Sequence, residues 1–243
     1  MKWGNININD LRLGNKNIVK AYYGTHIVFD KLEGYHNNHK WVDLGLPSGL
    51  LWATMNIGAT NTYDYGDYFS WGETSPKNTY TPENTPTYGA IMYGDNISGQ
   101  PRFDAATANW GGGWRMPTKE ELEEFDRYCT AEFVDINIGQ GLTDNFIKIC
   151  KIIGYNGVEI FLPLGGYKDG DVVIESSNTN VIEAKGHYWS ASQYIDDNYD
   201  MYYAYDLNAM KGIEQGDNLY IPYSARYYGH NIRAVLDRSS LNQ

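Results

Sequence analysis

The side chains best suited to specific chemistry gather near the C-terminus, in the stretch YWSASQYIDDNYDMYYAYDL and the residues that follow it. Ten of the 22 tyrosines fall between Tyr188 and Tyr228, with asparagines and aspartates among them. Tyrosine offers a large rigid contact area and a hydroxyl, and Asn, Asp and Ser add adaptable hydrogen bonds. A core would favour Leu, Ile and Val, and a disordered tail would avoid aromatic residues. The composition predicts a folded surface that binds another molecule by contact.

Strand periodicity and loop position select the candidate binding residues within this region. Side chains alternate between the two faces of a strand, so Tyr203, Tyr205 and Leu207 share one face of residues 202–207 and the even-numbered side chains share the other. We expect one face to be packed and the other exposed, and loop residues to be exposed as well. The predicted ligand-binding residues are Tyr194, Asp196, Asp197, Asn198, Tyr199, Tyr202, Tyr203, Asn218, Tyr220, Tyr223, Tyr228 and His230.

One segment has the spacing of a calcium loop. Asp196-x-Asn198-x-Asp200 matches the oxygen ligands that open an EF-hand. Met201 stands where that loop needs glycine, and Leu207 where it needs a bidentate glutamate. The sequence therefore predicts no metal site and no cofactor, and calcium stays open as the alternative.

The histidines and cysteines do not form a zinc motif. His36 and His39 have no acidic or thiol companion nearby, so we expect them in a solvated loop. Cys129 and Cys150 are too few for a disulfide framework. We expect reduced core thiols, with a single bridge as the alternative.

No nucleophile and base stand together in a catalytic motif. The late histidines, His187 and His230, have no motif-level partner. Ser190 and Ser192 closely follow Trp189 and are expected to be packing residues. The sequence predicts that the protein is not an enzyme.

Short strands and turns should hold these residues in place, because the chain has 26 glycines, many aromatic residues and few long helical runs. Asp104 is expected to cap a short helix over 105–109. Thr118 and Glu121 form a capping box for a helix that ends near Tyr128. With strands such as FIKICKIIG and VEIFLPLGGY, these elements predict an α+β fold with short strands, one or two helices and long loops.

The chain divides into three segments. Residues 1–33 contain LRLGNKNIV and AYYGTHIVF, two predicted tight hairpins that turn at Gly14 and Gly24. We expect them to form a small N-terminal β-hairpin module for attachment or assembly, which resembles short sheet modules of phage tail-tip and fibre proteins. The alternative is a plain β-appendage of the main domain. Residues 34–40 are polar and read as a linker, and residues 41–238 form the ligand-binding domain.

Large aromatic and cationic residues are expected to build the interior of that domain. Arg115 and Arg233 should act as structural clamps on buried carboxylates or carbonyls. Each buried indole N–H also needs a hydrogen-bond acceptor. The tryptophans expected in the core are Trp52, Trp71, Trp110, Trp114 and Trp189.

Several ordered motifs resemble those of one protein family. In NWGGGWRMPTKEELEEF, the run Arg115-Met116-Pro117-Thr118 with Glu121 matches Arg-Leu-Pro-Thr-x-x-Glu, and Gly229, Arg233 and Val235 match a closing Gly-x-x-x-Arg-x-Val strand. The other motifs are WVDLGLPSGLLWAT, YGDYFSWGET, IFLPLGGYKDG, HYWSAS and YYGHNIRAV. The chain thus resembles the domain named for the major paralogous family of Fibrobacter succinogenes, abundant in gut Bacteroidetes.

This resemblance implies a C-type lectin-like fold of the formylglycine-generating-enzyme subtype. Enzymes of that subtype oxidise a substrate cysteine with cysteines near their C-terminal end, and this chain has none after Cys150. The lectin calcium signatures Glu-Pro-Asn and Trp-Asn-Asp are also absent from the sequence. We therefore expect a non-catalytic ligand- or receptor-binding protein. The alternative is an enzyme related to formylglycine-generating or sulfatase-modifying proteins with altered chemistry.

The tyrosine-rich end further resembles the variable proteins of diversity-generating retroelements. There, adenine-directed mutation of asparagine codons leaves Asn, Tyr, Asp, Ser, Ala, His and Gly between fixed framework residues. The alternative is a domain family that is tyrosine-rich at its end without such variation. The framework residues implied here are Trp189, Ser190, Leu207, Arg233 and Val235.

Charge and hydropathy indicate the partners. A net charge of −11 would repel nucleic acid, and no run approaches the roughly 20 apolar residues of a membrane span. The expected partner is a cell-surface protein or glycan, with residues 1–33 joining a phage tail or surface-structure protein, and a homo-oligomer stays open. Because the start lacks the apolar run of a signal peptide, we expect a virion protein or, for a mature fragment, one on the bacterial cell surface.

Overall fold

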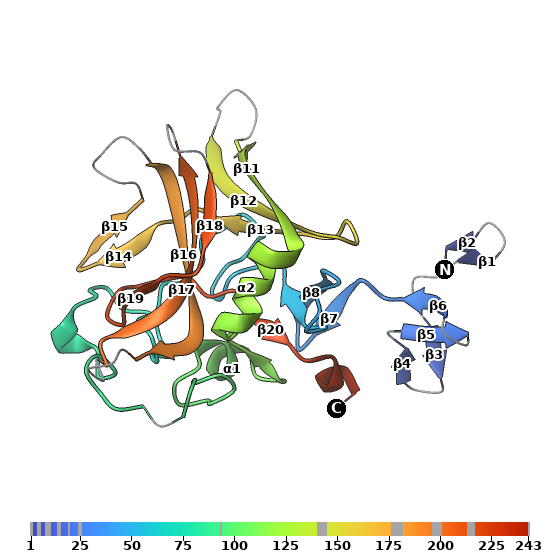
Figure 1. Ribbon diagram of the computed structural model, residues 1–243, viewed down its shortest axis with the longest axis horizontal. Helices are drawn as coiled ribbons and strands as arrows, with labels where there is room; N and C mark the ends of the chain where they lie inside the picture. The colour runs from blue at the N-terminus through green and yellow to red at the C-terminus, as the bar shows by residue number, and fades with distance from the viewer. Residues whose placement is uncertain are drawn as a thin grey trace.

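The structure is a computed structural model of the 243-residue chain. It describes residues 2–3, 6–7, 11–13, 16–18, 20–23, 26–92, 94–139, 145–175, 182–195, 201–212 and 217–242. Over these residues the protein is mostly β, with short strands, curled sheets, two α-helices and long loops (Figure 1). This architecture agrees with the predicted mixture of short strands, one or two helices and long loops.

A five-stranded antiparallel sheet joins the two ends of the main domain. Its strand order is β10-β20-β9-β8-β7, so the last strand of the chain lies between two early ones. Val235 pairs with both Trp52 and Arg115. The strands are β7 (Glu33–His36), β8 (His39–Asp43), β9 (Leu51–Ala53), β10 (Trp114–Arg115) and β20 (Val235–Leu236).

The prediction that residues 34–40 form a linker is wrong. They belong to the hairpin β7–β8, which turns at Asn37 and Asn38, both with positive φ, as a two-residue type I′ turn requires. His36 bonds the Gly112 carbonyl through Nε2 at 2.5 Å. His39 stacks on Trp110 with ring centroids 3.8 Å apart. These two histidines are therefore packed against the main domain and do not lie in a solvated loop.

A second antiparallel sheet is built around the long hairpin β16–β17. A register shift between Trp189 and Gln193 makes β16 bulge away from β17. The Ala191 N–H donates to Pro117 O at 2.6 Å, and the Lys119 N–H donates to Ser192 Oγ at 3.0 Å. The bulge thus receives the start of helix α2. The strands are β16 (Ile182–Tyr194), β17 (Tyr203–Gly212), β18 (Asn218–Tyr220) and β19 (Tyr223–Ala225), the last two both pairing with β17.

Further strands complete the main domain. A three-stranded antiparallel sheet has the order β11-β12-β13, and β14 and β15 form a separate pair. The strands that FIKICKIIG and VEIFLPLGGY predicted are present as β12 and β13. The bounds are β11 (Cys129–Asn137), β12 (Phe146–Gly154), β13 (Glu159–Pro163), β14 (Tyr167–Asp169) and β15 (Val172–Ile174).

The N-terminal segment consists of three two-stranded hairpins, which Figure 1 shows to one side of the main domain beyond β7. Leu13 pairs with Lys16 and Tyr23 pairs with His26, so two of the hairpins close over two-residue connections as predicted. Gly14 and Gly24 themselves lie outside the described residues. The strands are β1 (Lys2–Trp3), β2 (Ile6–Asn7), β3 (Leu11–Leu13), β4 (Lys16–Ile18), β5 (Lys20–Tyr23) and β6 (His26–Asp30).

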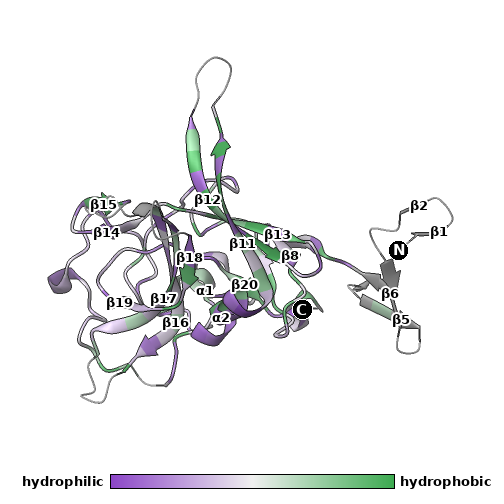
Figure 2. Ribbon diagram, turned by 45° about the horizontal axis from the view of Figure 1, so that its top comes forward, coloured by the Kyte–Doolittle hydropathy of each residue, from purple (hydrophilic) through white to green (hydrophobic). Residues whose placement is uncertain are grey.

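Local capping signals correctly predicted both α-helices. Asp104 accepts a hydrogen bond from the Thr107 N–H at the start of α1 (Ala105–Trp110). Thr118 and Glu121 form the predicted capping box of α2 (Lys119–Tyr128). Figure 2 shows α2 as largely hydrophilic, and its buried residues are Leu122 and Phe125.

Two short 3-10 helices are also present, η1 (Pro82–Asn84) and η2 (Arg238–Asn242). η1 lies in the long proline-rich connection between β9 and α1. No helix among the described residues is both long and apolar enough to cross a lipid bilayer.

Strand alternation sorts the interior into two clusters of buried side chains. In β9, Leu51 and Ala53 belong to one cluster and Trp52 to the other. In β17, Ala204 belongs to the first and Leu207 to the second. β9 therefore packs on both of its faces, and β17 has buried side chains on both faces from Asp206 onward.

Four of the five predicted core tryptophans are fully buried: Trp52, Trp71, Trp114 and Trp189. Trp110 is half-buried and packs at the margin of the first cluster. The indole N–H of Trp71 donates to Ser190 O at 2.9 Å, and the indole N–H of Trp189 donates to Phe69 O at 2.7 Å. These bonds tie the loop after β9 to β16.

Two arginines hold separate segments together, one of them fully buried (Arg233) and the other half-buried (Arg115). Arg233 donates to Asn56 Oδ1, Ala53 O and Phe161 O at 2.7–3.0 Å, and Arg115 forms a bidentate pair with Glu121. Both predicted clamps are confirmed. Burial lowers the pKa of Arg233 to about 10, so the side chain stays charged at neutral pH.

A substitution at Arg233 tests the clamp. Arg233→Lys keeps the charge but cannot match the planar fork that reaches three acceptors. We expect the free energy of unfolding to fall by about 2 kcal/mol, measured by urea denaturation. Arg102→Lys, at an exposed arginine, is the control and should change it by less than about 0.5 kcal/mol. Equal effects of the two substitutions would contradict the clamp.

Both cysteines are free thiols on adjacent strands. Burial raises the pKa of Cys129 to about 11 and also raises that of Cys150. Because only the thiolate reacts, we expect neither cysteine to be alkylated at pH 7.5 in the folded protein. Both should react in denaturant, as mass spectrometry after iodoacetamide treatment would show. Rapid labelling of either cysteine in the folded protein would contradict the burial that raises the pKa of these thiols.

Candidate functional site

Four tyrosines interlock on one face of the β16–β17 sheet: Tyr194, Tyr203, Tyr205 and Tyr223, here called the tyrosine surface. The rings of Tyr194 and Tyr223 stack with centroids 3.9 Å apart. Tyr203 meets Tyr223 edge-on at 5.4 Å, and Tyr205 meets Tyr194 edge-on at 5.5 Å. Aromatic pairs in these arrangements contribute about 0.5–1.5 kcal/mol each beyond their burial. The four rings hold one another in fixed positions while staying partly open to solvent.

Strand register brings these rings together. Tyr194 of β16 is paired with Tyr203 of β17, and Tyr205 of β17 is paired with Tyr223 of β19. Side chains directly opposite one another in antiparallel strands lie on the same face. Tyrosines from three strands thus form one continuous patch.

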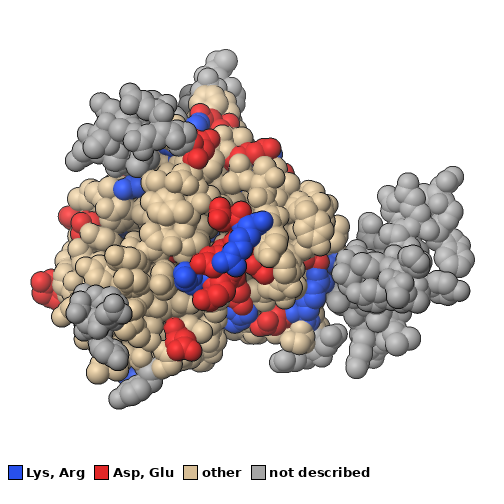
Figure 3. All heavy atoms as spheres, in the orientation of Figure 1, with Lys and Arg blue, Asp and Glu red and all other residues tan. Residues whose placement is uncertain are grey.

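A polar groove of about 480 Å³ adjoins the tyrosine surface. Lys119, the first residue of α2, places its ammonium 4.6 Å from the ring centroid of Tyr205 and 3.2 Å from Glu123. Figure 3 shows acidic and basic side chains gathered over α2. The groove is lined by Asp95, Asn96, Lys119, Glu120, Ser192, Gln193, Ile195 and Tyr205. It offers carboxylate, amide, hydroxyl and ammonium groups beside aromatic rings.

A second aromatic group surrounds Tyr202, just before β17. Its ring lies 4.8 Å from that of Tyr88, which in turn lies 5.2 Å from Tyr227. Gly89, with φ +74°, allows this approach, because a Cβ there would lie 2.8 Å from the Tyr202 ring. Arg226 donates to Thr87 O and Ala90 O at 3.1 Å and fixes the loop beneath.

The predicted binding residues do not form one patch. Tyr202, Tyr220 and Tyr223 are 43%, 38% and 49% exposed, and Asn218 is exposed as well. Tyr194, Tyr203 and Tyr228 are half-buried. Asn218 and Tyr220 lie on β18, opposite Met210 and Asn208, at the other end of β17 from the tyrosine surface. Four predicted residues lie outside the described ones: Asp196, Asp197, Asn198 and Tyr199.

His230 is fully buried, so the prediction that it contacts a surface ligand is wrong. Its ring stacks on Trp189 with centroids 3.9 Å apart. Its backbone N–H and carbonyl bond to the carbonyl and N–H of Phe69 at 3.0 and 2.9 Å. His230 is held inside the domain by these contacts.

The expected alternation along residues 202–207 holds only for the first half of β17. Tyr203 and Tyr205 are half-exposed, while Ala204 and Asp206 on the opposite face are fully buried. Leu207, on the tyrosine face, is buried as well. From Asp206 onward both faces of β17 are packed, because the second cluster covers the tyrosine side of the strand.

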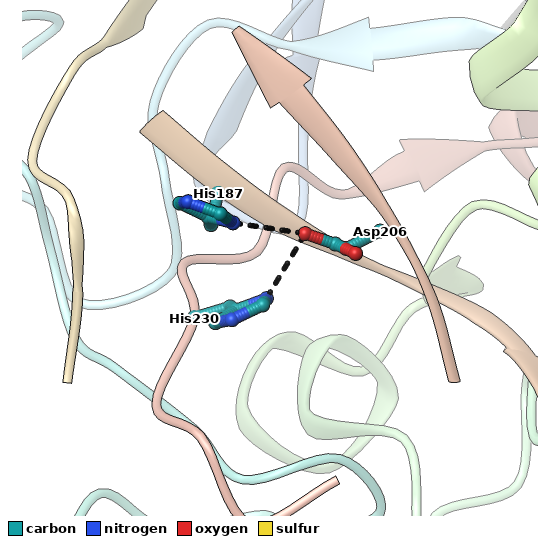
Figure 4. Close-up of side chains that lie close together, drawn as sticks. All are labelled: His187, Asp206 and His230. Carbon is teal, nitrogen blue, oxygen red and sulfur yellow. Dashed lines mark hydrogen bonds and ion pairs between the residues drawn. The ribbon is translucent and has the colours of Figure 1, made fainter. Parts of the chain in front are cut away.

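Sequence reasoning missed a buried polar group formed by His187, Asp206 and His230 (Figure 4). His187 Nδ1 lies 3.0 Å and His230 Nδ1 lies 3.5 Å from the same carboxylate oxygen, Asp206 Oδ2. His187 is 8% exposed, and Asp206 and His230 are 0% exposed. No local motif predicts this group, because strand pairing and a distant loop bring its members together. It gives both late histidines a partner in Asp206, which no motif in the sequence indicated.

Burial holds the His230 imidazole in its neutral form. Desolvation, and then the nearby charges of His187 and Lys185, lower the pKa of His230 well below its ordinary value. A neutral imidazole keeps a nitrogen lone pair, which is the form that binds a metal. Two imidazoles and a carboxylate could thus hold a transition metal ion. The segment Asp196-x-Asn198-x-Asp200, which the sequence left open as an alternative calcium loop, lies outside the described residues.

No protein-family model, curated protein or solved structure matches this chain. The resemblance to the Fibrobacter-type domain therefore rests on the motifs of the chain.

A double-mutant cycle tests whether the tyrosine surface is rigid. Tyr194→Ala and Tyr223→Ala should each destabilise the fold, with a coupling energy of about 1 kcal/mol for the stacked pair. Urea denaturation of the wild type, both single variants and the double variant gives this value. Tyr155, which is 78% exposed, provides the control, since Tyr155→Ala should be additive with Tyr223→Ala. If the losses of unfolding free energy from Tyr194→Ala and Tyr223→Ala add fully in the double variant, the two rings are independent and the surface is not rigid.

Proposed function

We propose that this protein is a non-catalytic binding protein of C-type lectin-like fold that recognises a cell-surface protein or glycan. The observation that carries this proposal is the interlocked tyrosine surface beside a polar groove. Rings already held by stacking lose little conformational entropy when a ligand binds. The surface is therefore organised before contact.

The chemistry of the patch suits a ligand with both apolar faces and hydroxyl or amide groups. Tyr205 and Tyr223 offer aromatic contact area. Asp95, Glu120 and Gln193 line the groove and offer hydrogen-bonding groups. Sugar rings and peptide loops both present such mixed surfaces. An aromatic platform with a few convergent polar groups is a common arrangement for ligand recognition.

The topology supports the proposed fold. The closing strand that the resemblance implies corresponds to β20, which follows Arg233 and pairs with β9 and β10. The implied framework residues Trp189, Leu207 and Val235 are all fully buried. This division between buried framework and partly exposed tyrosines is also what the retroelement hypothesis requires. A neighbouring template repeat and reverse transcriptase gene would support that hypothesis, and the absence of both would contradict it.

The proposed carrier is a phage tail or a bacterial surface structure. The three hairpins formed by β1 to β6 are small antiparallel pairs, and isolated two-stranded pairs gain stability by packing on other surfaces. We assign this segment the role of attachment. Tail genes beside this gene would favour a virion protein, and pilus or lipoprotein genes would favour the cell surface.

An array of glycans and cell-surface proteins tests the binding proposal. We expect Tyr205→Ala/Tyr223→Ala to weaken binding to any ligand of the wild type at least tenfold, as loss of a central aromatic contact costs about 2 kcal/mol. Surface plasmon resonance with each ligand from the array measures the affinity, and near-ultraviolet circular dichroism checks the fold. Tyr155→Ala should bind as the wild type does. The proposal fails if the wild type binds nothing on the array or if the double variant keeps wild-type affinity.

A further inference from the structure

We propose that His187, Asp206 and His230 form a site for one divalent first-row transition metal ion, with zinc as the reference ion. This inference is independent of the tyrosine surface. The first observation is that two imidazole nitrogens lie 3.0 and 3.5 Å from the same carboxylate oxygen. Figure 4 shows the three side chains pointing toward one another.

The separations fit a shared ion. Two ligand atoms each about 2.1 Å from zinc lie about 3.0 Å apart at a right angle and about 3.4 Å apart at a tetrahedral angle. The two distances to Asp206 Oδ2 are close to these values. One donor atom from each residue also lies within 4.8 Å of the others.

Unpartnered atoms inside the protein supply a second observation. His187 Nε2, Asp206 Oδ1 and both ring nitrogens of His230 are buried and have no hydrogen-bond partner among the described residues. Buried polar atoms without partners are costly and uncommon in native folds. An ion held by the two Nδ1 atoms and Asp206 Oδ2 would give His230 Nδ1 a partner and neutralise the buried carboxylate.

The surrounding structure holds the donors in place. Trp189 stacks on His230, and the Tyr167 ring packs edge-on against His187 at 4.9 Å. Asn208, opposite His187 in the strand register, lies with its amide nitrogen 3.5 Å from Asp206 Oδ2. Support of this kind around the ligands strengthens metal binding. The slight exposure of His187 leaves an approach from solvent.

The donor set selects the kind of ion. Calcium and magnesium prefer oxygen ligands, whereas two imidazoles with one carboxylate suit zinc and iron(II). Three protein ligands leave at least one coordination position for water or another small ligand. A divalent transition metal is therefore the predicted occupant.

The test uses the full chain, stripped with EDTA and dialysed. Added Co²⁺ should produce visible d–d absorption bands that saturate at one ion per chain, and Zn²⁺ should displace it while excess Ca²⁺ should not. His187→Gln and Asp206→Asn should each weaken Zn²⁺ binding by at least about 100-fold. The matched control, His36→Gln/His39→Gln, removes two other histidines and should leave the affinity within about threefold of wild type.

Circular dichroism of each variant separates loss of the site from loss of the fold. His187 is the least buried of the three residues, so we expect His187→Gln to fold. If Asp206→Asn does not fold, the Zn²⁺ affinity of His187→Gln alone decides the test. The inference is overturned if the wild type binds less than one Zn²⁺ per chain at micromolar concentration. Wild-type affinity in His187→Gln, or displacement of Co²⁺ by Ca²⁺, would also overturn it.

Discussion

The alternation of side chains along β17 is the constraint on which both candidate sites depend. Tyr203 and Tyr205 point to the partly exposed face, while Asp206 points into the interior toward His187 and His230. A shift of one residue in the strand register would exchange the two faces. It would bury the tyrosines and remove the carboxylate from the histidines, so pairing with β16 and β19 maintains both arrangements together.

Non-local contacts keep this strand in position. Arg226 is fully buried, lies over the Trp71 ring at 4.4 Å, and donates to Tyr203 O at 3.0 Å. The bulge of β16 accepts the start of α2, whose Lys119 lies over Tyr205. The tyrosine surface is therefore supported by the buried Arg226, by the indole of Trp71 and by the capped helix α2. A rigid patch of this kind suits recognition by shape and contact.

Local sequence signals predicted part of this structure. The caps at Asp104 and Thr118 and the hairpin spacings needed only neighbouring residues, and their predictions are confirmed. Residues 34–40 have the polar composition of a linker because they lie in an edge hairpin with exposed residues such as Tyr35. The pair Asn37–Asn38, which suits a two-residue turn, is the sequence signal that indicates the hairpin. The group of His187, Asp206 and His230 could not be predicted, because its members converge only when β16, β17 and the loop after β19 are assembled.

The exposure of individual tyrosine rings tests the central claim most directly. Solvent paramagnetic relaxation of ring protons, in protein with isotopically labelled tyrosine, reports this exposure residue by residue. Fast relaxation is predicted for Tyr223 and intermediate relaxation for Tyr203 and Tyr205, with near-complete protection of the fully buried Tyr188. Protection of Tyr203, Tyr205 and Tyr223 equal to that of Tyr188 would contradict an outward-facing tyrosine surface.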